Sequence, residues 1–167
     1  MLAQLDGTSL PAWIYHDPGF FELEKREIFR RSWQVVCHLS DIPNAGDYHT
    51  LELLGESMVV VRGEEGRVRA FHNVCRHRAA RLLDPGRGSC GAHIVCPYHA
   101  WTYALDGRLI GVPQRASFPG LVPGEHGLLP LEHEIFAGFV FVRLAGGLPQ
   151  VAEMMAPYAG EIAAYRF

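Results

Sequence analysis

Two short motifs, each combining one cysteine with one histidine, constrain this chain more than any other feature. The first is a Cys-x-His pair, Cys75 and His77, and the second, after an 18-residue spacer, is a Cys-x-x-His pair, Cys96 and His99. Neither a helix nor a flat strand brings a cysteine and a histidine at these spacings onto one centre, so each pair must lie on a tight loop. The sequence therefore predicts two loops at hairpin tips that together bind a metal centre.

Two kinds of metal centre accept two thiolates and two imidazoles. Zinc would take them as a tetrahedral site. A [2Fe–2S] cluster would take them in the Rieske arrangement, with both thiolates on one iron and both imidazoles on the other. Zinc fingers usually pair cysteines in one half and histidines in the other, whereas each half is mixed here. The mixed halves favour the iron–sulfur cluster, and a zinc-stapled structural module is the alternative.

The composition is that of a soluble globular protein. Of the 167 residues, 49% are apolar and 20% are charged, which suffices for the core of one domain. The formal net charge of −3 gives no electrostatic case for binding nucleic acid or an anionic membrane. Residues 1–6 do not resemble a secretory signal, and no apolar run reaches the ~20 residues of a membrane helix. We therefore expect a cytoplasmic protein whose four cysteines are metal ligands or free thiols.

Apolar periodicity and turn signals predict one helix followed by short strands. Asp17 and Pro18 form a typical helix start, and residues 20–32 continue it. Strands are expected at residues 34–38, 47–54, 58–62, 67–71, 93–96, 102–105, 108–110, 129–136 and 139–144. Residues 112–127, with three prolines and three glycines, are expected to form a surface loop, and residues 86–91 a second loop. Strands this short favour a mainly β fold, an antiparallel sandwich or barrel.

Three segments follow from this pattern. Residues 1–35 are expected to form an N-terminal arm and helix, residues 36–147 the β domain that carries both motifs, and residues 148–167 a helical tail interrupted by Pro157. The arm, residues 1–16, is expected to be irregular, with an extended anchor near its end. We interpret the tail, which ends without a cap or closing strand, as leading towards a further domain.

The residues around both motifs resemble a known family. NVCRHR (73–78), CPYHAWTY (96–103) and DG (106–107) look like the Rieske [2Fe–2S] domain in the α subunit of ring-hydroxylating-type non-haem iron oxygenases. The resemblance runs from about residue 13 to the end of the chain. Ala79 and Ala100 stand where many members have glycine, which looks closer to the branch that oxidises amines such as choline and betaines.

The resemblance implies a ligand set and a redox character. Cys75 and Cys96 would bind one iron through sulfur, and His77 and His99 the other through ring nitrogens. Two neutral imidazoles in place of two thiolates make the cluster less negative than a four-cysteine cluster and easier to reduce. The resemblance also implies electrons from an NAD(P)H-dependent reductase or a ferredoxin.

The respiratory Rieske proteins add a disulfide between the two loops and a serine hydroxyl near the sulfurs. The matching positions look like Ala80 and Tyr98 for the disulfide and Trp101 for the serine, so neither feature is expected. Fewer hydrogen bonds to the cluster predict a potential below that of the respiratory type. Trp101 is expected to pack beneath the cluster loop and shield it from water.

Other residues with reactive or charged side chains have simpler interpretations. Cys37 lies in an apolar strand and is expected in the core, and Cys90 is expected to be a free thiol in a glycine-rich loop. Arg76, Arg78 and Arg81 either dock an acidic redox partner or a neighbouring subunit, or form an ordinary solvated face.

Oxygen activation in this family needs a second iron on two histidines and a carboxylate, and the sequence has no good candidate for that triad. His126, His133 and Glu134 are a weak combination, since two of them lie in a predicted strand. The chain is therefore predicted to be the electron-entry part of an oxygenase, an oxidoreductase of aromatic-hydrocarbon catabolism or amine oxidation. Its electrons would pass to a mononuclear iron outside this chain, which the resemblance places in the adjacent subunit of a homotrimer. A free-standing Rieske ferredoxin is the alternative, although it would need neither arm nor tail.

Overall fold

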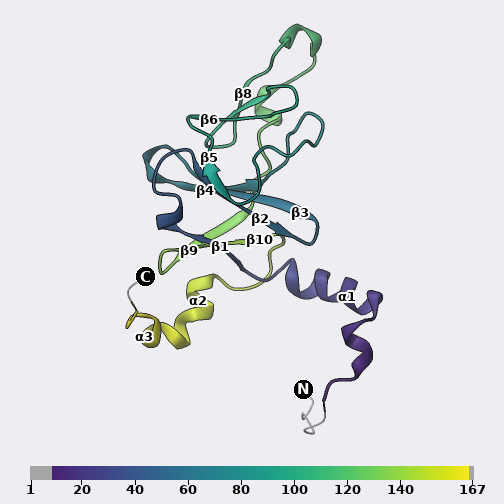
Figure 1. Ribbon diagram of the computed structural model, residues 1–167, viewed down its shortest axis with the longest axis vertical. Helices are drawn as coiled ribbons and strands as arrows, with labels where there is room; N and C mark the ends of the chain where they lie inside the picture. Colours follow the sequence, from purple (N-terminus) through teal and green to yellow (C-terminus); the bar gives the residue numbers. More distant parts are fainter. Residues whose placement is uncertain (1–8, 166–167) are drawn as a thin grey trace.

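The computed structural model describes residues 9–165 as three small antiparallel sheets with a helical arm before them and a helical tail after them (Figure 1). The strands are β1 (Gln34–His38), β2 (Asp47–Leu53), β3 (Glu56–Arg62), β4 (Val68–His72), β5 (Arg87–Ser89), β6 (His93–Val95), β7 (Thr102–Ala104), β8 (Leu109–Gly111), β9 (Glu132–Phe136) and β10 (Phe139–Arg143). The helical elements are α1 (Pro18–Glu24), the π-helical turn η2 (Lys25–Phe29), α2 (Val151–Met155) and α3 (Ala159–Ile162), with 3-10 turns at Ala12–Tyr15, Leu39–Asp41, Glu64–Gly66, Arg115–Ser117, Pro123–Glu125 and Ala156–Tyr158. Between residues 9 and 165 no helix is long and apolar enough to cross a membrane.

The three sheets are open and share two separate cores. A central sheet of order β4-β3-β2-β5 is flanked by β1-β10-β9 and by β6-β7-β8, and every pairing is antiparallel. The prediction of a mainly β, antiparallel fold is confirmed. The barrel alternative is wrong for the part of the chain that the structure describes, because none of its sheets closes on itself.

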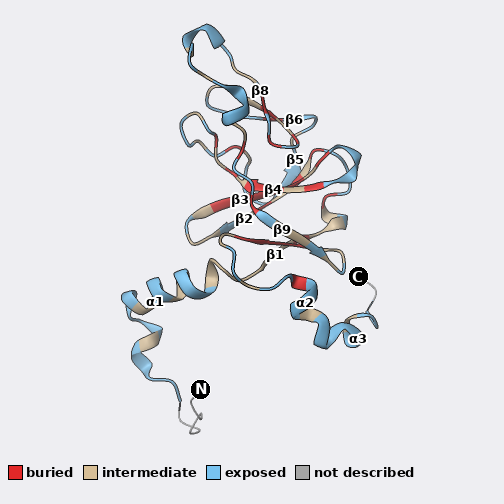
Figure 2. Cartoon of the chain, turned by 180° about the vertical axis from the view of Figure 1, so that it is seen from behind, coloured by how far each residue is buried: buried red, intermediate tan, exposed pale blue. Residues whose placement is uncertain are grey.

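Strand β3 explains why two cores form. Successive side chains of a strand point to opposite faces, so Met58 and Val60 enter the core shared with β1 and β10, while Val59 and Val61 enter the core shared with β6 and β7. All four are essentially inaccessible to solvent. Figure 2 shows that buried residues gather on the sheets in the middle of the molecule. Burying each side chain stabilises the fold by about 1.5–3 kcal/mol. The unbroken apolar run in the sequence is thus a strand covered on both faces.

Two predicted hairpins position the metal-binding motifs. Strands β3 and β4 pair from Met58 opposite His72 to Arg62 opposite Val68, and the first motif follows β4 directly. The second motif lies between β6 and β7, and β7 turns into β8 at Gly107. Gly107 has φ +90°, and a Cβ there would lie 2.6 Å from a ring carbon of Phe71, so only glycine fits this turn.

The N-terminal helix begins where the sequence predicts. The Asp17 carboxylate accepts a hydrogen bond of 2.6 Å from the Phe20 N–H, and Pro18 occupies the first turn. Regular helix ends at Glu24 and η2 continues it to Phe29, three residues before the predicted end near residue 32. The Ser32 N–H still donates to the Ile28 carbonyl over 2.9 Å. Figure 1 shows α1 projecting away from the sheets.

The predicted irregular arm, residues 1–16, lies partly outside the described residues. Within the described part, Ala12–Tyr15 forms a 3-10 turn, so the expected extended anchor is wrong. Trp13 is exposed and meets the sheets nowhere among its ring contacts; its ring edge packs against Phe20. Trp13 therefore packs against the helix that follows it.

One strand was not predicted. Arg87–Ser89 pairs with the start of β2 as β5, where a loop of residues 86–91 was expected. Gly88 lies against the ring of Tyr48, and a Cβ there would come within 2.7 Å of the Tyr48 oxygen. All three residues of β5 are exposed, so no apolar alternation marks this strand in the sequence. The other predicted loop, residues 112–127, is confirmed, with two short 3-10 turns.

The two ends of the β domain are fastened together. The Trp33 indole N–H donates to the Pro149 carbonyl over 2.9 Å, and the Arg143 guanidinium lies over the Trp33 ring at 4.2 Å. The Glu134 carboxylate accepts the Val151 N–H at the start of α2 over 2.7 Å. The predicted helical tail is present as α2 and α3 and starts from a fixed point beside the arm.

Candidate metal centre

Both motifs lie on loops with the same backbone pattern. In loop 1, residues 75–80, the Cys75 N–H donates to the Ala80 carbonyl over 2.8 Å, and the Ala79 N–H donates back to the Cys75 carbonyl over 3.0 Å. The equivalent bonds in loop 2, residues 96–101, are 2.8 and 2.9 Å long. The prediction that each Cys–His pair lies on a tight loop is therefore confirmed.

Each loop turns at an alanine in a left-handed conformation. Ala79 and Ala100 both have φ +54°, a region where a Cβ clashes with the backbone at a cost of about 1–2 kcal/mol. These are the two positions at which the resembled family often has glycine. The loops therefore keep the shape that glycine favours, and the alanines carry the strain.

The two motif cysteines are buried beside one another at the base of the loops. Cys75 and Cys96 are each 2% exposed and belong to the core between the central sheet and β6-β7-β8. Burial raises the pKa of the Cys75 thiol, hydrogen bonds from Tyr103 and the His77 backbone lower it, and the neighbouring Cys96 raises it further. Two adjacent thiols of this kind become a stable pair of thiolates only when a cation balances them.

A tyrosine hydroxyl that the sequence analysis missed reaches the sulfur of Cys75. The Tyr103 oxygen lies 3.3 Å from Cys75 Sγ and accepts the Arg76 N–H over 3.0 Å. Burial raises the pKa of the Tyr103 hydroxyl, so it stays protonated and its hydrogen can point at the sulfur. The sequence analysis considered a hydroxyl only at the position of Trp101, where the respiratory type has serine, and did not consider Tyr103. The available signal was the alternation along β7, which puts residues 101 and 103 on one side.

The two motif histidines face each other with one nitrogen each left unpartnered. The ring centroids of His77 and His99 are 4.7 Å apart. Nδ1 of each ring is buried and has no hydrogen-bond partner. Desolvation lowers the pKa of His77, with contributions from His99 and Arg78, which favours the neutral form that binds metals. Buried polar atoms are nearly always satisfied, so a pair of orphaned nitrogens indicates a bound group.

An aromatic wall encloses His77. The Trp101 indole stacks on its ring, and Phe118 of the 112–127 loop meets both rings edge-on at 5.6 and 5.8 Å. Trp101 is buried, so the prediction that it packs beneath the cluster loop is confirmed. His99 is covered differently, by the exposed ring of Tyr98 at 3.8 Å between centroids.

Asn73 anchors both ends of loop 1. Its side chain is fully buried and donates to Ser57 Oγ (3.1 Å) and to the Leu83 carbonyl (2.8 Å), while its oxygen accepts the Leu83 N–H (2.9 Å). Ser57 belongs to β3, so one amide ties the strand before the loop to the segment after it. The position of Cys75 therefore depends on this amide.

The donor set fits a two-iron cluster better than a single ion. Cysteine lies beside cysteine and histidine beside histidine, and no three histidine, cysteine or carboxylate side chains in residues 9–165 converge as they would on one ion. A [2Fe–2S] cluster with two thiolates on one iron and two imidazoles on the other matches this pairing. The orphaned Nδ1 atoms are the donors that such a cluster would satisfy.

The weak second-iron triad is not brought together. His126 Nδ1 bonds the Val122 carbonyl, His133 bonds two backbone carbonyls, and Glu134 accepts the N–H at the start of α2. Each side chain is thus occupied in holding local structure.

The cysteines outside the motifs have the environments predicted for them. Cys37 lies in the core, and burial raises the pKa of its thiol to about 11. Cys90 is a free, partly exposed thiol whose Sγ lies 3.2 Å from the Gly46 carbonyl. Neither reaches the paired motifs, so loops 1 and 2 hold the only cysteines next to unpartnered imidazoles in the described chain.

The chain matches known proteins over the same residues. The family model for the Rieske [2Fe–2S] domain matches residues 32–129. The glycine betaine monooxygenase oxygenase subunit of Chromohalobacter salexigens is 43% identical over 99% of this chain and 37% of its own length. A quaternary ammonium Rieske monooxygenase in complex with L-carnitine has 35% identity and a TM-score of 0.86, over 93% of this chain and 44% of that one. For a naphthalene 1,2-dioxygenase the values are 33% and 0.79, over 87% and 33%. The chain thus spans less than half the length of each of these relatives.

Proposed function

Because this chain belongs to the Rieske [2Fe–2S] domain family, we propose that Cys75, His77, Cys96 and His99 hold a Rieske cluster and that the chain is the electron-transfer part of an oxygenase subunit. The observation that supports the ligand set most strongly is the pair of buried, unpartnered Nδ1 atoms beside two buried thiols. When bound, the cluster supplies storage for one electron at a time.

The surrounding residues suit this task in distinct ways. Trp101 and Phe118 exclude water from one side of His77, which lowers the local dielectric constant. The Tyr103 hydroxyl can donate to Cys75 sulfur and stabilise negative charge there. Tyr103 supplies one hydroxyl near the sulfurs, and no serine hydroxyl is present at Trp101. We therefore propose a reduction potential above that of a cluster without such hydrogen bonds and below that of the respiratory type.

The wider context is also a proposal. The matched relatives are oxygenase subunits more than twice as long as this chain, so we place the oxygen-activating iron in a part that this chain does not contain. We propose residues 36–147 as the cluster domain, residues 1–35 as its leading arm and residues 148–167 as the connection to the catalytic part. The working protein would be a cytoplasmic homotrimer supplied by an NAD(P)H-dependent reductase or a ferredoxin.

The substrate we propose is a quaternary ammonium compound. The relatives with the higher identities carry glycine betaine and quaternary ammonium in their names, at 43% and 35%. The naphthalene dioxygenase, which would support aromatic-hydrocarbon catabolism, has a lower identity of 33% and a lower TM-score. A longer protein containing this chain should therefore consume oxygen with glycine betaine or carnitine and not with naphthalene. The length of the natural open reading frame distinguishes this role from that of a free-standing Rieske ferredoxin, because an oxygenase subunit needs a catalytic part in addition to this chain.

The cluster assignment is tested by metal analysis of the reconstituted chain. Two irons and two sulfides per chain and a Rieske-type EPR signal on reduction are expected. Cys96→Ser should lose the cluster, whereas Cys90→Ser, a matched change at a free thiol, should keep it. A colourless protein with one zinc per chain would instead establish the zinc-stapled module.

A further inference from the structure

We propose that Glu52 is a positioning residue for the two metal ligands on loop 1. Its carboxylate holds the segment before the loop through Ser57 and Asn73, and the segment after the loop directly through Arg81. The inference rests on the proposed function, because it names a further residue that serves the same site. Glu52 acts through the position of the loop and is not itself a ligand.

A single carboxylate oxygen of Glu52 meets two donors. The Ser57 hydroxyl donates to Glu52 Oε1 over 2.6 Å, and the Arg81 guanidinium forms an ion pair with the same oxygen at 3.2 Å. A hydrogen bond to an ionised group is roughly twice as strong as one between neutral groups. The sequence analysis grouped Arg81 with Arg76 and Arg78 as a docking or solvated face, and in the structure Arg81 has this carboxylate as a partner.

The two donors lead to opposite ends of loop 1. Ser57 Oγ also accepts a hydrogen bond from the side-chain amide of Asn73 over 3.1 Å, and Asn73 lies two residues before Cys75. Arg81 follows the last residue of the loop, at the point where the chain bridges back to the segment before the loop. A change at Glu52 therefore acts on both ends of loop 1 at once.

Glu52 is held on a rigid support. It lies opposite Ser57 in the antiparallel ladder of β2 and β3, so both side chains project from the same face of the sheet. The two strands join through a tight turn in which Leu54 and Gly55 have positive φ, of 55° and 80°. A side chain on paired strands keeps its position better than one on a loop. The Glu52–Ser57 pair can therefore fix loop 1, which contains no strand.

Burial makes the inner part of this network sensitive to substitution. The Glu52 and Arg81 side chains are 44% and 46% exposed, so their ion pair alone stabilises the fold little. Ser57 and Asn73 are buried, and water does not readily replace a partner that they lose. All four residues, together with Ala79 of the loop, line one hollow beside loop 1. We expect the loss of Glu52 to act chiefly through Ser57 and Asn73 on the start of the loop.

Hydrogen exchange on the purified chain, with or without its cluster, tests the position of loop 1 directly. The reporters are the Cys75 N–H, which bonds across the loop, and the Leu83 N–H, which bonds the amide of Asn73. In Glu52→Ala both should exchange about tenfold faster than in wild type, because a hydrogen bond to a charged group is lost. Glu52→Gln loses the same charge but keeps an oxygen that can accept both contacts. Its exchange rates should lie between those of wild type and Glu52→Ala.

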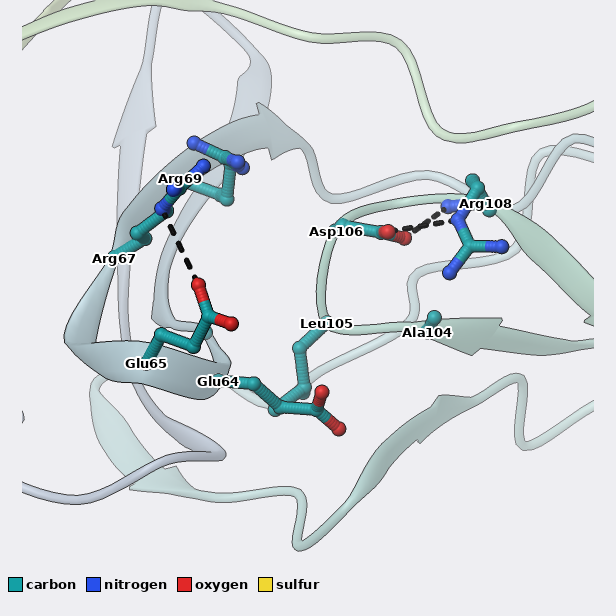
Figure 3. Close-up of a pocket in the computed structure, with 9 residues that line it drawn as sticks. Glu64, Glu65, Arg67, Arg69, Ala104, Leu105, Asp106 and Arg108 are labelled. Carbon is teal, nitrogen blue, oxygen red and sulfur yellow. Dashed lines mark hydrogen bonds and ion pairs between the residues drawn. The ribbon is translucent and has the colours of Figure 1, made fainter.

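The matched control is Glu65→Ala. Glu65 also forms an ion pair with an arginine, Arg67, at 3.7 Å, but this pair lies at the turn between β3 and β4, at the end of the hairpin away from loop 1 (Figure 3). Glu65→Ala should exchange like wild type. Arg81→Gln breaks the network from its other side and should speed exchange at Cys75 more than at Leu83. This variant decides the proposal if Glu52→Ala fails to fold.

Retention of the cluster connects the position of loop 1 to its function. With an excess of iron chelator, the cluster-loaded Glu52→Ala chain should lose iron about tenfold faster than wild type, and Glu52→Gln should again be intermediate. Both variants remove the same charge, so any shift in the reduction potential should be the same in the two. Iron loss that differs between them therefore reports the anchor and not the charge.

Each other outcome overturns a stated claim. Equal exchange and equal iron loss in wild type and Glu52→Ala would refute the positioning role. Equal changes in Glu52→Ala and Glu52→Gln would assign the effect to the carboxylate charge and refute the role as well. A wild-type chain that loads no cluster would overturn the proposed function, whereas the exchange rates would still show whether Glu52 holds loop 1.

Discussion

The indole of Trp101 lies flat against the imidazole of His77, with ring centroids 4.9 Å apart and planes inclined by 7°. Phe118 closes the remaining edge of both rings. The stack fixes the plane of the imidazole, and so fixes where its buried Nδ1 points. A side chain that touches no sulfur or iron can thereby set the geometry of a ligand.

Trp101→Leu is expected to weaken cluster retention about 10- to 100-fold, the usual effect of losing a residue that orients a ligand. The leucine removes the flat surface and lets water reach His77. The measurement is the decay of visible absorption when the loaded protein meets an excess of iron chelator. Trp13→Leu, at an exposed indole on the arm, should decay like wild type. Equal decay in all three proteins would show that the stack does not matter.

Tyr103→Phe is expected to lower the reduction potential by about 40–60 mV. The hydroxyl stabilises negative charge on Cys75 sulfur, and that charge increases on reduction, so its loss disfavours the reduced state. One hydrogen bond of about 1–1.5 kcal/mol corresponds to that shift for a one-electron couple. Voltammetry measures it directly. Tyr48→Phe in the same core should leave the potential unchanged, and an unchanged potential in Tyr103→Phe would rule out the bond as a tuning element.

The Tyr103 contact illustrates what the sequence could not reveal. The sequence predicted the two tight loops and the packing of Trp101, because both depend on local backbone and neighbouring residues. The hydroxyl reaches Cys75 across 28 residues, through the packing of β7 against loop 1, and no local pattern encodes that distance. The hydroxyl near the sulfur belongs to Tyr103, two residues after the position where the resemblance places the serine.

The fold likewise contains elements that local sequence predicts and elements that depend on distant parts of the chain. β3 was predictable because both faces are buried, and α1 because Asp17 and Pro18 mark its start. β5 was not, since its three residues are exposed and pair only because β2 passes beside them. The change from α-helix to the π-helical turn η2 could not be predicted from the sequence either, because a π-helical turn requires no particular residue type.

Ala79→Gly and Ala100→Gly are each expected to stabilise the protein by about 0.5–1 kcal/mol. Glycine removes the steric cost at φ +54°, of about 1–2 kcal/mol, but adds conformational freedom to the unfolded chain. Chemical denaturation of the single variants measures the change. Ala80→Gly is the matched control, since Ala80 has no positive φ and should lose stability. Destabilisation in both loop variants would show that the left-handed turn costs nothing here.

Asn73→Ala is expected to destabilise the protein by about 2–4 kcal/mol. The change leaves the Leu83 N–H and carbonyl without this partner, and each unsatisfied buried group costs about 1–3 kcal/mol. Ser57 Oγ loses one bond but still donates to the Glu52 carboxylate over 2.6 Å. Loop 1 should loosen with it, so cluster loading should fall in parallel. Asn44→Ala, at an exposed asparagine, should cost far less. Full loading in a strongly destabilised Asn73→Ala protein would separate the anchor from the metal centre.

Glu132→Gln is expected to flatten the acid side of the stability profile. Hydrogen bonds from Arg143 lower the pKa of Glu132, so this carboxylate stabilises the fold above its usual pKa of about 4.3 and stops doing so as pH falls through the lower, folded value. Arg143 is only 7% exposed and lies over Trp33, so the pair also fastens the two ends of the domain.

The size and the pH range of this effect are both measurable. Because the Glu132 side chain is 48% exposed, its contribution is about 1 kcal/mol or less. Urea unfolding followed by tryptophan fluorescence should show wild type more stable than Glu132→Gln at pH 6–7, with the gap closing below about pH 4. Glu153→Gln, on the exposed face of α2, should follow wild type at every pH. If the free energies of unfolding of wild type and Glu132→Gln change in parallel with pH, the carboxylate charge does not stabilise this junction. Arg143 would then be held by its stacking on Trp33 and its hydrogen bond to the Leu148 carbonyl.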